Sequence, residues 1–159
     1  MAKQALKILD SKVICRQPGR YIGWPTIAKT AKGELLAVFS GDRDAHVCPC
    51  GKTFLIRSRD KGTTWSAPEL INDTPLDDRD TGICIAADGT LVVSWFTSHY
   101  TDESYLARCT SEADKKQRRK LLAGIKKDEI KQWGGLEILD NRYECGHWIR
   151  RSLDNGKTW

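Results

Sequence analysis

The chain has 159 residues, 40% of them hydrophobic, and a formal net charge of +5, which is the size of one ordinary domain with enough apolar residues for a core. No apolar stretch approaches the ~20 residues of a membrane span and the first residues lack the apolar core of a secretory signal, so we expect no membrane partner; localisation stays open, with a preference for the cytoplasm. The basic residues gather at 115–120, KKQRRK, without interleaved aromatics or a binding motif, which argues against a nucleic-acid partner.

Residues 24–40, WPTIAKTAKGELLAVFS, predict the first β-hairpin, because two β-type runs flank a Lys-Gly turn and glycine accepts the positive φ of a tight turn. Residues 53–58, TFLIRS, predict a third strand, and residues 67–72, APELIN, predict a short fourth strand. Between them lies the string SRDKGTTW at residues 58–65. This part of the chain therefore predicts a four-stranded antiparallel meander.

Residues 82–98, GICIAADGTLVVSWFTS, repeat the hairpin around an Asp-Gly turn. Residues 147–152, HWIRRS, repeat the third strand and run directly into SLDNGKTW at residues 152–159. Between them, residues 102–133 change toward a helical period, with an apolar stripe opposite a basic face, and predict a helical insertion. We expect this insertion to be either a lid beside the functional site or a solvated decoration.

Two copies of one meander indicate a repeat architecture, because a single sheet cannot bury both of its faces and stacking such sheets around an axis is the logic of a β-propeller. We therefore predict an all-β fold, a partial propeller over residues 1–159 with a first blade at about 21–72 and an incomplete second blade at about 80–159. Since propellers have about four to eight blades, we expect the chain to be an inactive fragment that aggregates through its open sheet faces.

The repeated string has a structural interpretation. Its aspartate can accept backbone N–H bonds inside the turn, its glycine adopts a positive φ, and its tryptophan offers a flat surface for packing between neighbouring sheets. Both copies contain the same elements: Ser58, Asp60, Gly62, Thr64 and Trp65 in the first, and Ser152, Asp154, Gly156, Thr158 and Trp159 in the second. No catalytic role is expected of either copy.

The spelling S-x-D-x-G-x-T-W is the Asp-box, and two copies that follow third strands make the chain resemble the sialidase and BNR-repeat superfamily of glycoside hydrolases. The resemblance spans the chain except for about residues 100–140. It implies a six-bladed propeller and an exo-glycosidase that acts on a terminal, acidic sugar, with a carbohydrate substrate and an open oligomeric state. Because Asp-boxes also occur in propellers that are not sialidases, a non-catalytic propeller that binds glycan or protein is the alternative.

If the Asp-boxes occupy one rim of the propeller, function is sought in the loops of the opposite rim, at residues 41–52 and 73–82. Carboxylates and arginines there suit glycoside hydrolysis, because a carboxyl can protonate a leaving oxygen while arginines hold an acidic sugar. The alternative is that these charges pair with one another and order the rim. The candidates are Asp44 and Asp42 for catalysis and Arg20, Arg43, His46, Asp78, Arg79 and Asp80 for substrate binding, with Tyr21, Lys52, Asp77, His99 and Asp102 around the same mouth.

The resemblance implies that the acid/base is an aspartate of the loop at 41–52. By position, Asp44 is the first choice and Asp42 the second. Arg43 would contact a substrate anion or position the acid. The nucleophile and the further arginines of the family would lie beyond Trp159.

One departure from the family concerns the first strand. Sialidases open it with an arginine just before an apolar residue and a proline, and here Gly23 stands before Trp24-Pro25. This departure leaves the identity of the sugar open. Trp24 and Tyr21 are interpreted either as an apolar floor for a sugar ring or as core residues.

The cysteines are the remaining signal. HVCPC at residues 46–50 places a histidine beside two cysteines, but Cys-x-Cys is not the usual ligand spacing and no second pair follows at a finger-like interval, so neither a metal nor a cofactor is expected. The 6 cysteines are scattered along the chain and resemble no small disulfide framework.

Overall fold

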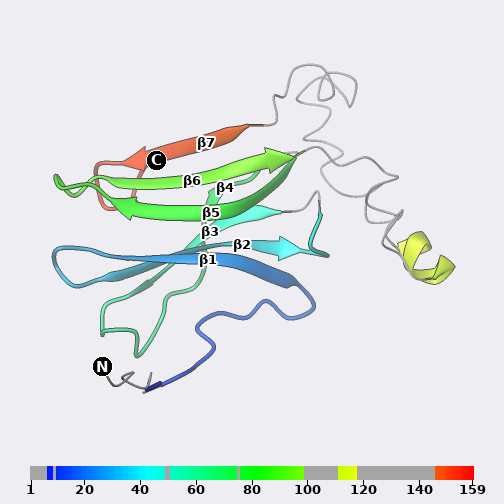
Figure 1. Ribbon diagram of the computed structural model, residues 1–159, viewed down its shortest axis with the longest axis horizontal. Coiled ribbons are helices and arrows are strands. Elements are labelled where there is room, and N and C mark those ends of the chain that lie inside the picture. Colours follow the sequence, from blue (N-terminus) through cyan, green and yellow to red (C-terminus); the bar gives the residue numbers. More distant parts are fainter. Residues whose placement is uncertain (1–6, 9, 49–50, 75, 99–110, 118–145) are drawn as a thin grey trace, which may run out of the picture.

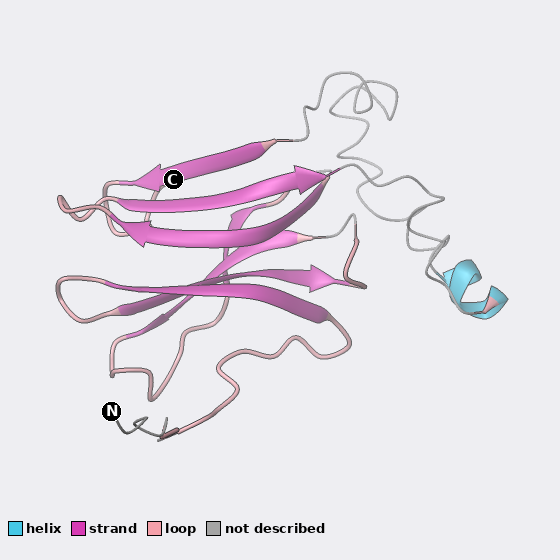
Figure 2. Ribbon diagram, in the orientation of Figure 1, coloured by secondary structure: helices cyan, strands magenta, loops and turns pink. Residues whose placement is uncertain are grey.

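The protein is all-β in the part of the chain that the computed structural model describes, which comprises residues 7–8, 10–48, 51–74, 76–98, 111–117 and 146–159. Strands dominate these residues, and the only helix among them is a short one at 112–117 (Figure 2). The expected all-β class is therefore confirmed. No helix in these ranges is long and apolar enough to cross a membrane.

The first sheet is a four-stranded antiparallel meander whose strands lie in chain order. Its first turn is the predicted Lys-Gly hairpin: Gly33 has a φ of 88° and its N–H donates to the Thr30 carbonyl at 2.9 Å. Glycine suits this position because a positive φ costs it little. The strands are β1 (Tyr21–Lys29), β2 (Leu35–Arg43), β3 (Lys52–Ser58) and β4 (Glu69–Asn72).

The second sheet repeats the arrangement with three antiparallel strands in the order β5-β6-β7. They are β5 (Asp77–Ile85), β6 (Leu91–Ser98) and β7 (His147–Ser152). The turn at Gly89 is the predicted Asp-Gly hairpin, and the Gly89 N–H donates to the Ala86 carbonyl at 2.9 Å. The two predicted hairpins and both predicted third strands are thus confirmed.

The boundaries of these strands correct the sequence-based expectation. β2 continues through Asp42 and Arg43, and β5 begins at Asp77 instead of near residue 82. The loop expected at 41–52 is therefore shorter, since β3 already begins at Lys52. Hydrophobic alternation does not reveal these extensions, because the residues involved are charged and yet Arg43 and Asp77 are completely buried.

The two sheets pack face to face and enclose the main core between them (Figure 1). Along β6 every second side chain is buried, which is the alternation of a strand with one face on a core. Leu36, Val38, Leu55 and Ile71 of the first sheet meet Leu91, Val93 and Trp95 of the second. Burial of such side chains stabilises the packed pair by about 1.5–3 kcal/mol each.

A smaller cluster lies on the opposite face of the first sheet. Phe39 and Ile56 form its centre, and the half-buried side chains of Cys15 and Trp65 pack against it. The Lys12 ammonium donates to the Thr63 carbonyl at 2.9 Å, so the segment before β1 is tied to the turn that carries Trp65. The centre of the outer face of the first sheet, on β2 and β3, is therefore covered within this chain.

The first S-x-D-x-G-x-T-W string forms a turn that its own side chains close. The Thr64 N–H and hydroxyl donate to the Asp60 carboxylate at 2.8 and 2.7 Å, and the Gly62 N–H donates to the Ser58 hydroxyl at 2.8 Å. Gly62 has a φ of 89°. The Trp65 indole N–H donates to the Gly62 carbonyl at 3.1 Å, which orients the ring against the outer face of the first sheet.

The second string repeats this turn at the end of β7. The Thr158 N–H and hydroxyl donate to the Asp154 carboxylate at 2.9 and 2.7 Å, and the Gly156 N–H donates to the Ser152 hydroxyl at 2.7 Å. Trp159 packs against the main core between the two sheets. Each tryptophan thus lies on a face of the first sheet, Trp65 on the outer face and Trp159 on the inner face.

Candidate functional site

The candidate site lies at the end of the sheets opposite the hairpin turns and the two strings. We call this the loop end; in Figure 1 it is the right-hand end, where β2 and β6 finish and β5 begins. Among the described residues, the polar segments that were predicted to form a mouth gather here, because those at 20–21, 41–52 and 73–82 each begin or end a strand at this end.

A buried ion pair forms the interior of the loop end. The Arg43 guanidinium and the Asp77 carboxylate lie 2.7 Å apart, and both side chains have no exposed surface. Arg43 also donates to the carbonyls of His46 at 2.6 Å and Asp78 at 3.1 Å. A side chain at Gly51 would collide with this guanidinium, so the loop must pass over it at a glycine.

The Asp77 carboxylate in this interior has a shifted pKa. Its removal from water raises the pKa of Asp77, and the charges of Arg43 and Arg79 oppose that rise. Its second oxygen accepts the Cys48 N–H at 3.2 Å. One buried carboxylate therefore joins β5, the end of β2 and the loop after it.

Asp78 fastens the loop between the two sheets. Its carboxylate accepts the Thr74 N–H at 2.7 Å and the Thr74 hydroxyl at 2.9 Å, while its own carbonyl accepts the Ser40 hydroxyl at 3.2 Å. Asp78 is completely buried. The structure thus engages Arg43 and Asp78, two of the predicted substrate-binding residues, with internal partners, as in the alternative in which the charges order the rim.

An aromatic group lies above this interior. Its members are Tyr21, Trp24 and His46, whose ring centroids lie 5.8 Å apart for Tyr21–Trp24, 5.0 Å for Trp24–His46 and 6.2 Å for Tyr21–His46. Tyr21 and His46 are exposed and Trp24 is half-buried. The Arg43 guanidinium lies 5.0 Å from the Trp24 ring centroid, so the aromatic group rests on the buried ion pair.

A network of partly exposed charges borders the aromatic group. The Asp42 carboxylate lies 3.2 Å from the Arg20 guanidinium and 3.0 Å from the Lys52 ammonium, which also lies 3.4 Å from Asp73. Burial alone would lower the pKa of Lys52, but Asp42 and Asp73 raise it. The Asp42 N–H donates to the Gln17 side chain at 2.6 Å, with Asp42 at a φ of 55°.

Asp44, the first choice for the acid, begins the loop after β2. Its side chain is half-buried and its N–H lies 3.1 Å from the buried Cys48 sulfur. Asp44 stands between Asp42 and the exposed His46 along the chain. Asp44 is therefore two residues along the chain from a member of the charge network on one side and from a member of the aromatic group on the other.

Arg79 and Asp80 form a bulge in β5 that repeats one in β1. In β1 the register shifts after Gly23, and Trp24 follows with a φ of 52°. In β5 the register shifts after Arg79, and Asp80 follows with a φ of 56°. Arg79 therefore occupies in the second sheet the position that Gly23 occupies in the first.

This equivalence was missed at the level of the sequence. A similar pattern is present in the two strands: Trp24 precedes Pro-Thr-Ile in β1, and Asp80 precedes Thr-Gly-Ile in β5. The two bulges also touch: the Thr81 hydroxyl donates to the Trp24 carbonyl at 3.2 Å. The Arg79 guanidinium lies 5.0 Å from the Phe96 ring and 3.7 Å from Asp77, with its side chain 17% exposed.

Several predictions fall outside the described residues. They concern His99, Asp102, Cys50 and the helical insertion at 102–133 apart from the helix at 112–117. Within the described ranges, no group of three or more His, Cys, Asp or Glu side chains is arranged to hold a metal ion. The cysteines described there, Cys15, Cys48 and Cys84, are free thiols.

Comparisons with known proteins give information on the fold only. No protein-family model matches the chain, and no curated protein matches it. Among solved structures, the chain is similar to a protein of unknown function from Dyadobacter fermentans DSM 18053, with a TM-score of 0.60 and 22% identity. The match covers 92% of this chain and 37% of the other, so this chain spans little more than a third of the length of that neighbour.

Proposed function

We propose that the two sheets are neighbouring blades of an Asp-box propeller and that the loop end is the mouth of a sialidase-like exo-glycosidase, which acts on a terminal, acidic sugar. The observation that carries this proposal is the meeting of the aromatic group with cations and carboxylates at the loop end, away from both Asp-box turns. Face-to-face packing of two meanders, each with its Asp-box after the third strand, supports the propeller arrangement.

The aromatic group and the cations suit an acidic sugar. The exposed Tyr21 and His46 rings offer an apolar surface for the ring of the sugar, as small-molecule sites commonly do. Arg79 and Arg20 supply guanidinium groups, which bind carboxylates with two parallel hydrogen bonds. Because Gly23 carries no side chain, Arg79 takes over the role that an arginine at that position plays in the family.

Asp44 is the proposed general acid. In this reaction the Asp44 carboxyl gives its proton to the glycosidic oxygen as the bond between that oxygen and the anomeric carbon breaks. The aglycone leaves as an alcohol, and water supplies the hydroxyl group that ends on the anomeric carbon and the proton that restores the Asp44 carboxyl. Asp42 already holds two cations, Arg20 and Lys52, and is better suited to keep them in place than to transfer a proton. Of the two predicted catalytic aspartates, Asp44 is therefore the one that we retain as the acid.

The test is hydrolysis of a panel of fluorogenic glycosides, including a sialoside and a glucuronide, by a full-length protein that carries all blades of the proposed propeller and by its Asp44→Asn variant. Loss of a positioned general acid lowers kcat by about 100-fold or more. Asp88→Asn, in the hairpin turn at the opposite end, is the matched control and should keep wild-type activity. Full activity of Asp44→Asn would show that the acid is another residue.

The alternative is a non-catalytic propeller that binds glycan or protein at the same mouth. It is favoured by the internal pairing of Arg43, Asp77 and Asp78, which leaves fewer charged groups at the surface. The same panel separates the two functions. A protein that binds the acidic glycosides but hydrolyses none of them would be a binding propeller.

A further inference from the structure

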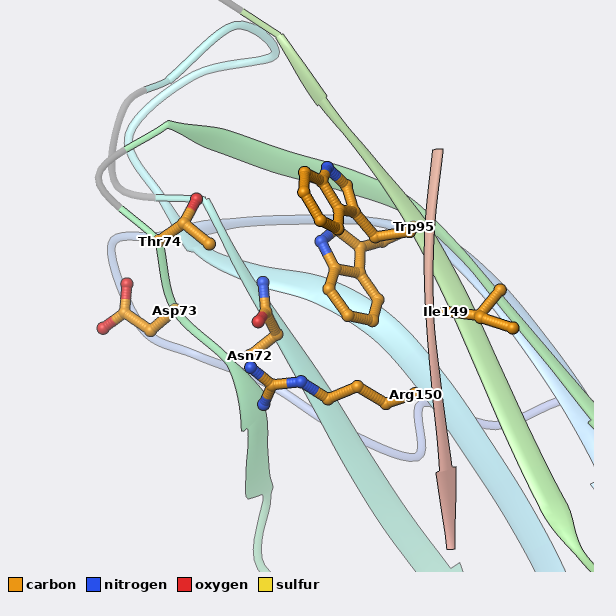
Figure 3. Close-up of a pocket in the computed structure, with 7 residues that line it drawn as sticks. Asn72, Asp73, Thr74, Trp95, Ile149 and Arg150 are labelled. Carbon is orange, nitrogen blue, oxygen red and sulfur yellow. The ribbon is translucent and has the colours of Figure 1, made fainter. Parts of the chain in front are cut away.

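A cavity outside the mouth opens between the two sheets. It has a volume of about 210 Å³ and lies between the end of β4 and the strand β7 (Figure 3). The first sheet and the loop after it contribute Asn72, Asp73 and Thr74, and the second sheet contributes Trp95, Trp148 and Arg150. None of these residues belongs to the aromatic group or to the proposed acid.

One wall of the cavity is aromatic. Trp95 comes from the middle strand of the second sheet and Trp148 from the strand beside it, and the two are register partners. The Trp148 indole N–H donates to the Thr97 hydroxyl at 3.0 Å, which fixes the orientation of that ring. The Arg150 guanidinium lies 5.6 Å from the Trp95 ring centroid. The Trp148 indole, which is 41% exposed, therefore presents a rigid apolar surface to a ligand, and the buried Trp95 lies beside it.

The polar wall contains donors that lack acceptors. Asn72 is 2% exposed and Trp95 is 4% exposed, and within the described part of the chain neither the Asn72 amide nitrogen nor the Trp95 indole nitrogen has a hydrogen-bond partner. Figure 3 shows the Asn72 amide between the Asp73 carboxylate and the Trp95 indole, with Arg150 reaching toward it. A buried donor left unpaired costs about 1–3 kcal/mol, so a ligand that brings acceptor oxygens here relieves that cost.

We propose that this cavity is a second carbohydrate site, which takes one neutral pyranose ring. The volume is below the roughly 300–1,000 Å³ of sites for drug-sized ligands, which limits the ligand to about one ring. Hydroxyl groups accept from Asn72 and Trp95 and can donate to Asp73. A carboxylate ligand would face the Asp73 carboxylate, and the Arg150 guanidinium is already engaged with the Ile71 carbonyl and the Trp95 ring. The face of the ring lies on the Trp148 indole, which is 41% exposed.

The site adjoins the mouth and shares Asp73 with its charge network. Lys52 pairs with Asp42 at the mouth and with Asp73 at the edge of the cavity, so one lysine borders both. A glycan whose acidic terminal sugar enters the mouth could therefore place a neutral sugar in the cavity. The proposal of a second site does not require hydrolysis at the mouth, and each can fail alone.

The test is binding of methyl β-D-glucopyranoside, methyl β-D-galactopyranoside and methyl β-D-glucuronide to the purified protein, measured by saturation-transfer NMR and calorimetry. Trp148 is 41% exposed, so Trp148→Ala is expected to keep the fold and to weaken binding of a neutral glycoside at least tenfold. Leu153→Ala, 78% exposed at the end of the same strand, is the matched control and should bind as the wild type does. Asp44→Asn should also bind the neutral glycoside normally.

If circular dichroism shows that Trp148→Ala is unfolded, Arg150→Gln is used in its place and should also weaken binding of the neutral glycoside. Three results would overturn the proposal. One is that neither neutral glycoside binds, the second is that neither variant weakens binding, and the third is that the glucuronide binds more tightly than the neutral glycosides. Loss of binding in Asp44→Asn with normal binding in Trp148→Ala would place the sugar in the mouth instead.

Discussion

The Arg43–Asp77 pair is the residue-level feature on which the loop end depends. Both side chains are completely buried, and together they contact β2, β5 and the loop after β2. Removing one partner leaves the other charge buried without compensation, and such changes cost about 3–5 kcal/mol. We predict that Asp77→Ala lowers the free energy of unfolding by that amount, measured by urea denaturation followed by circular dichroism.

The control is an arginine in an exposed ion pair. Arg59 lies 3.1 Å from Glu34 with its side chain 83% exposed, and an exposed pair contributes about 0–1 kcal/mol. Arg59→Ala should therefore be nearly neutral. If Asp77→Ala costs no more than Arg59→Ala, the pair does not hold the loop end together. The double variant Arg43→Met with Asp77→Leu should cost less than Asp77→Ala, because it leaves no unpaired charge.

At the scale of elements, the Asp-box turn should make stability depend on pH. The Thr64 hydroxyl and N–H hold the pKa of Asp60 at about 2, below its ordinary value of 3.8. Because the folded state favours the ionised carboxylate, its contribution is complete above pH 3.8 and is lost as the pH falls through about 2. We predict that Asp60→Asn lowers Tm at neutral pH and that the difference from the wild type shrinks below pH 3.8.

The measurement is thermal unfolding of both proteins at a series of pH values from neutral to about 2. Asparagine keeps the size of the side chain and one acceptor oxygen, but it replaces the other acceptor, which the Thr64 N–H and hydroxyl use in the wild type, with an amide donor. The lost hydrogen bond contributes at every pH, so only the part of the Tm difference that changes with pH reports the charge. A difference in Tm that stays the same across the whole series would show that the charge of Asp60 does not contribute.

Some of these elements could be predicted from the sequence and others could not. Both hairpins could be predicted because their signals are local: Gly33 and Gly89 punctuate alternating runs. The extension of β2 to Arg43 could not be predicted, because a charged residue at the end of a strand is normally assigned to a loop. Only its buried partner on the other sheet, Asp77, shows that Arg43 belongs to the strand. For the same reason, the sequence does not show which of the charged residues at the loop end are buried, such as Arg43 and Asp78, and which are partly exposed, such as Asp42.

The whole molecule depends on the contact between the two sheets. Trp159 and Asn155 contribute to this contact at the end of the sheets opposite the loop end. Trp159 packs against the core that both sheets share, and the Asn155 amide donates to the Glu34 carboxylate of the first sheet at 3.0 Å. Burial alone would raise the pKa of Glu34, but hydrogen bonds from Asn155 and Arg59 lower it. The second Asp-box turn thus joins the sheets as well as closing β7.

We therefore predict that Trp159→Ala loosens the packing between the sheets. Truncation of a buried tryptophan costs about 3–5 kcal/mol, and because Trp159 is only partly buried we expect the lower end of that range. The measurement is urea denaturation, with near-ultraviolet circular dichroism to follow the packing of Trp95 in the shared core. Leu153→Ala in the same turn, whose side chain is 78% exposed, is the control and should change stability by less than about 0.5 kcal/mol. Equal effects of the two substitutions would mean that the sheets are held by the strand contacts alone, since the tryptophan would then contribute no more than an exposed side chain.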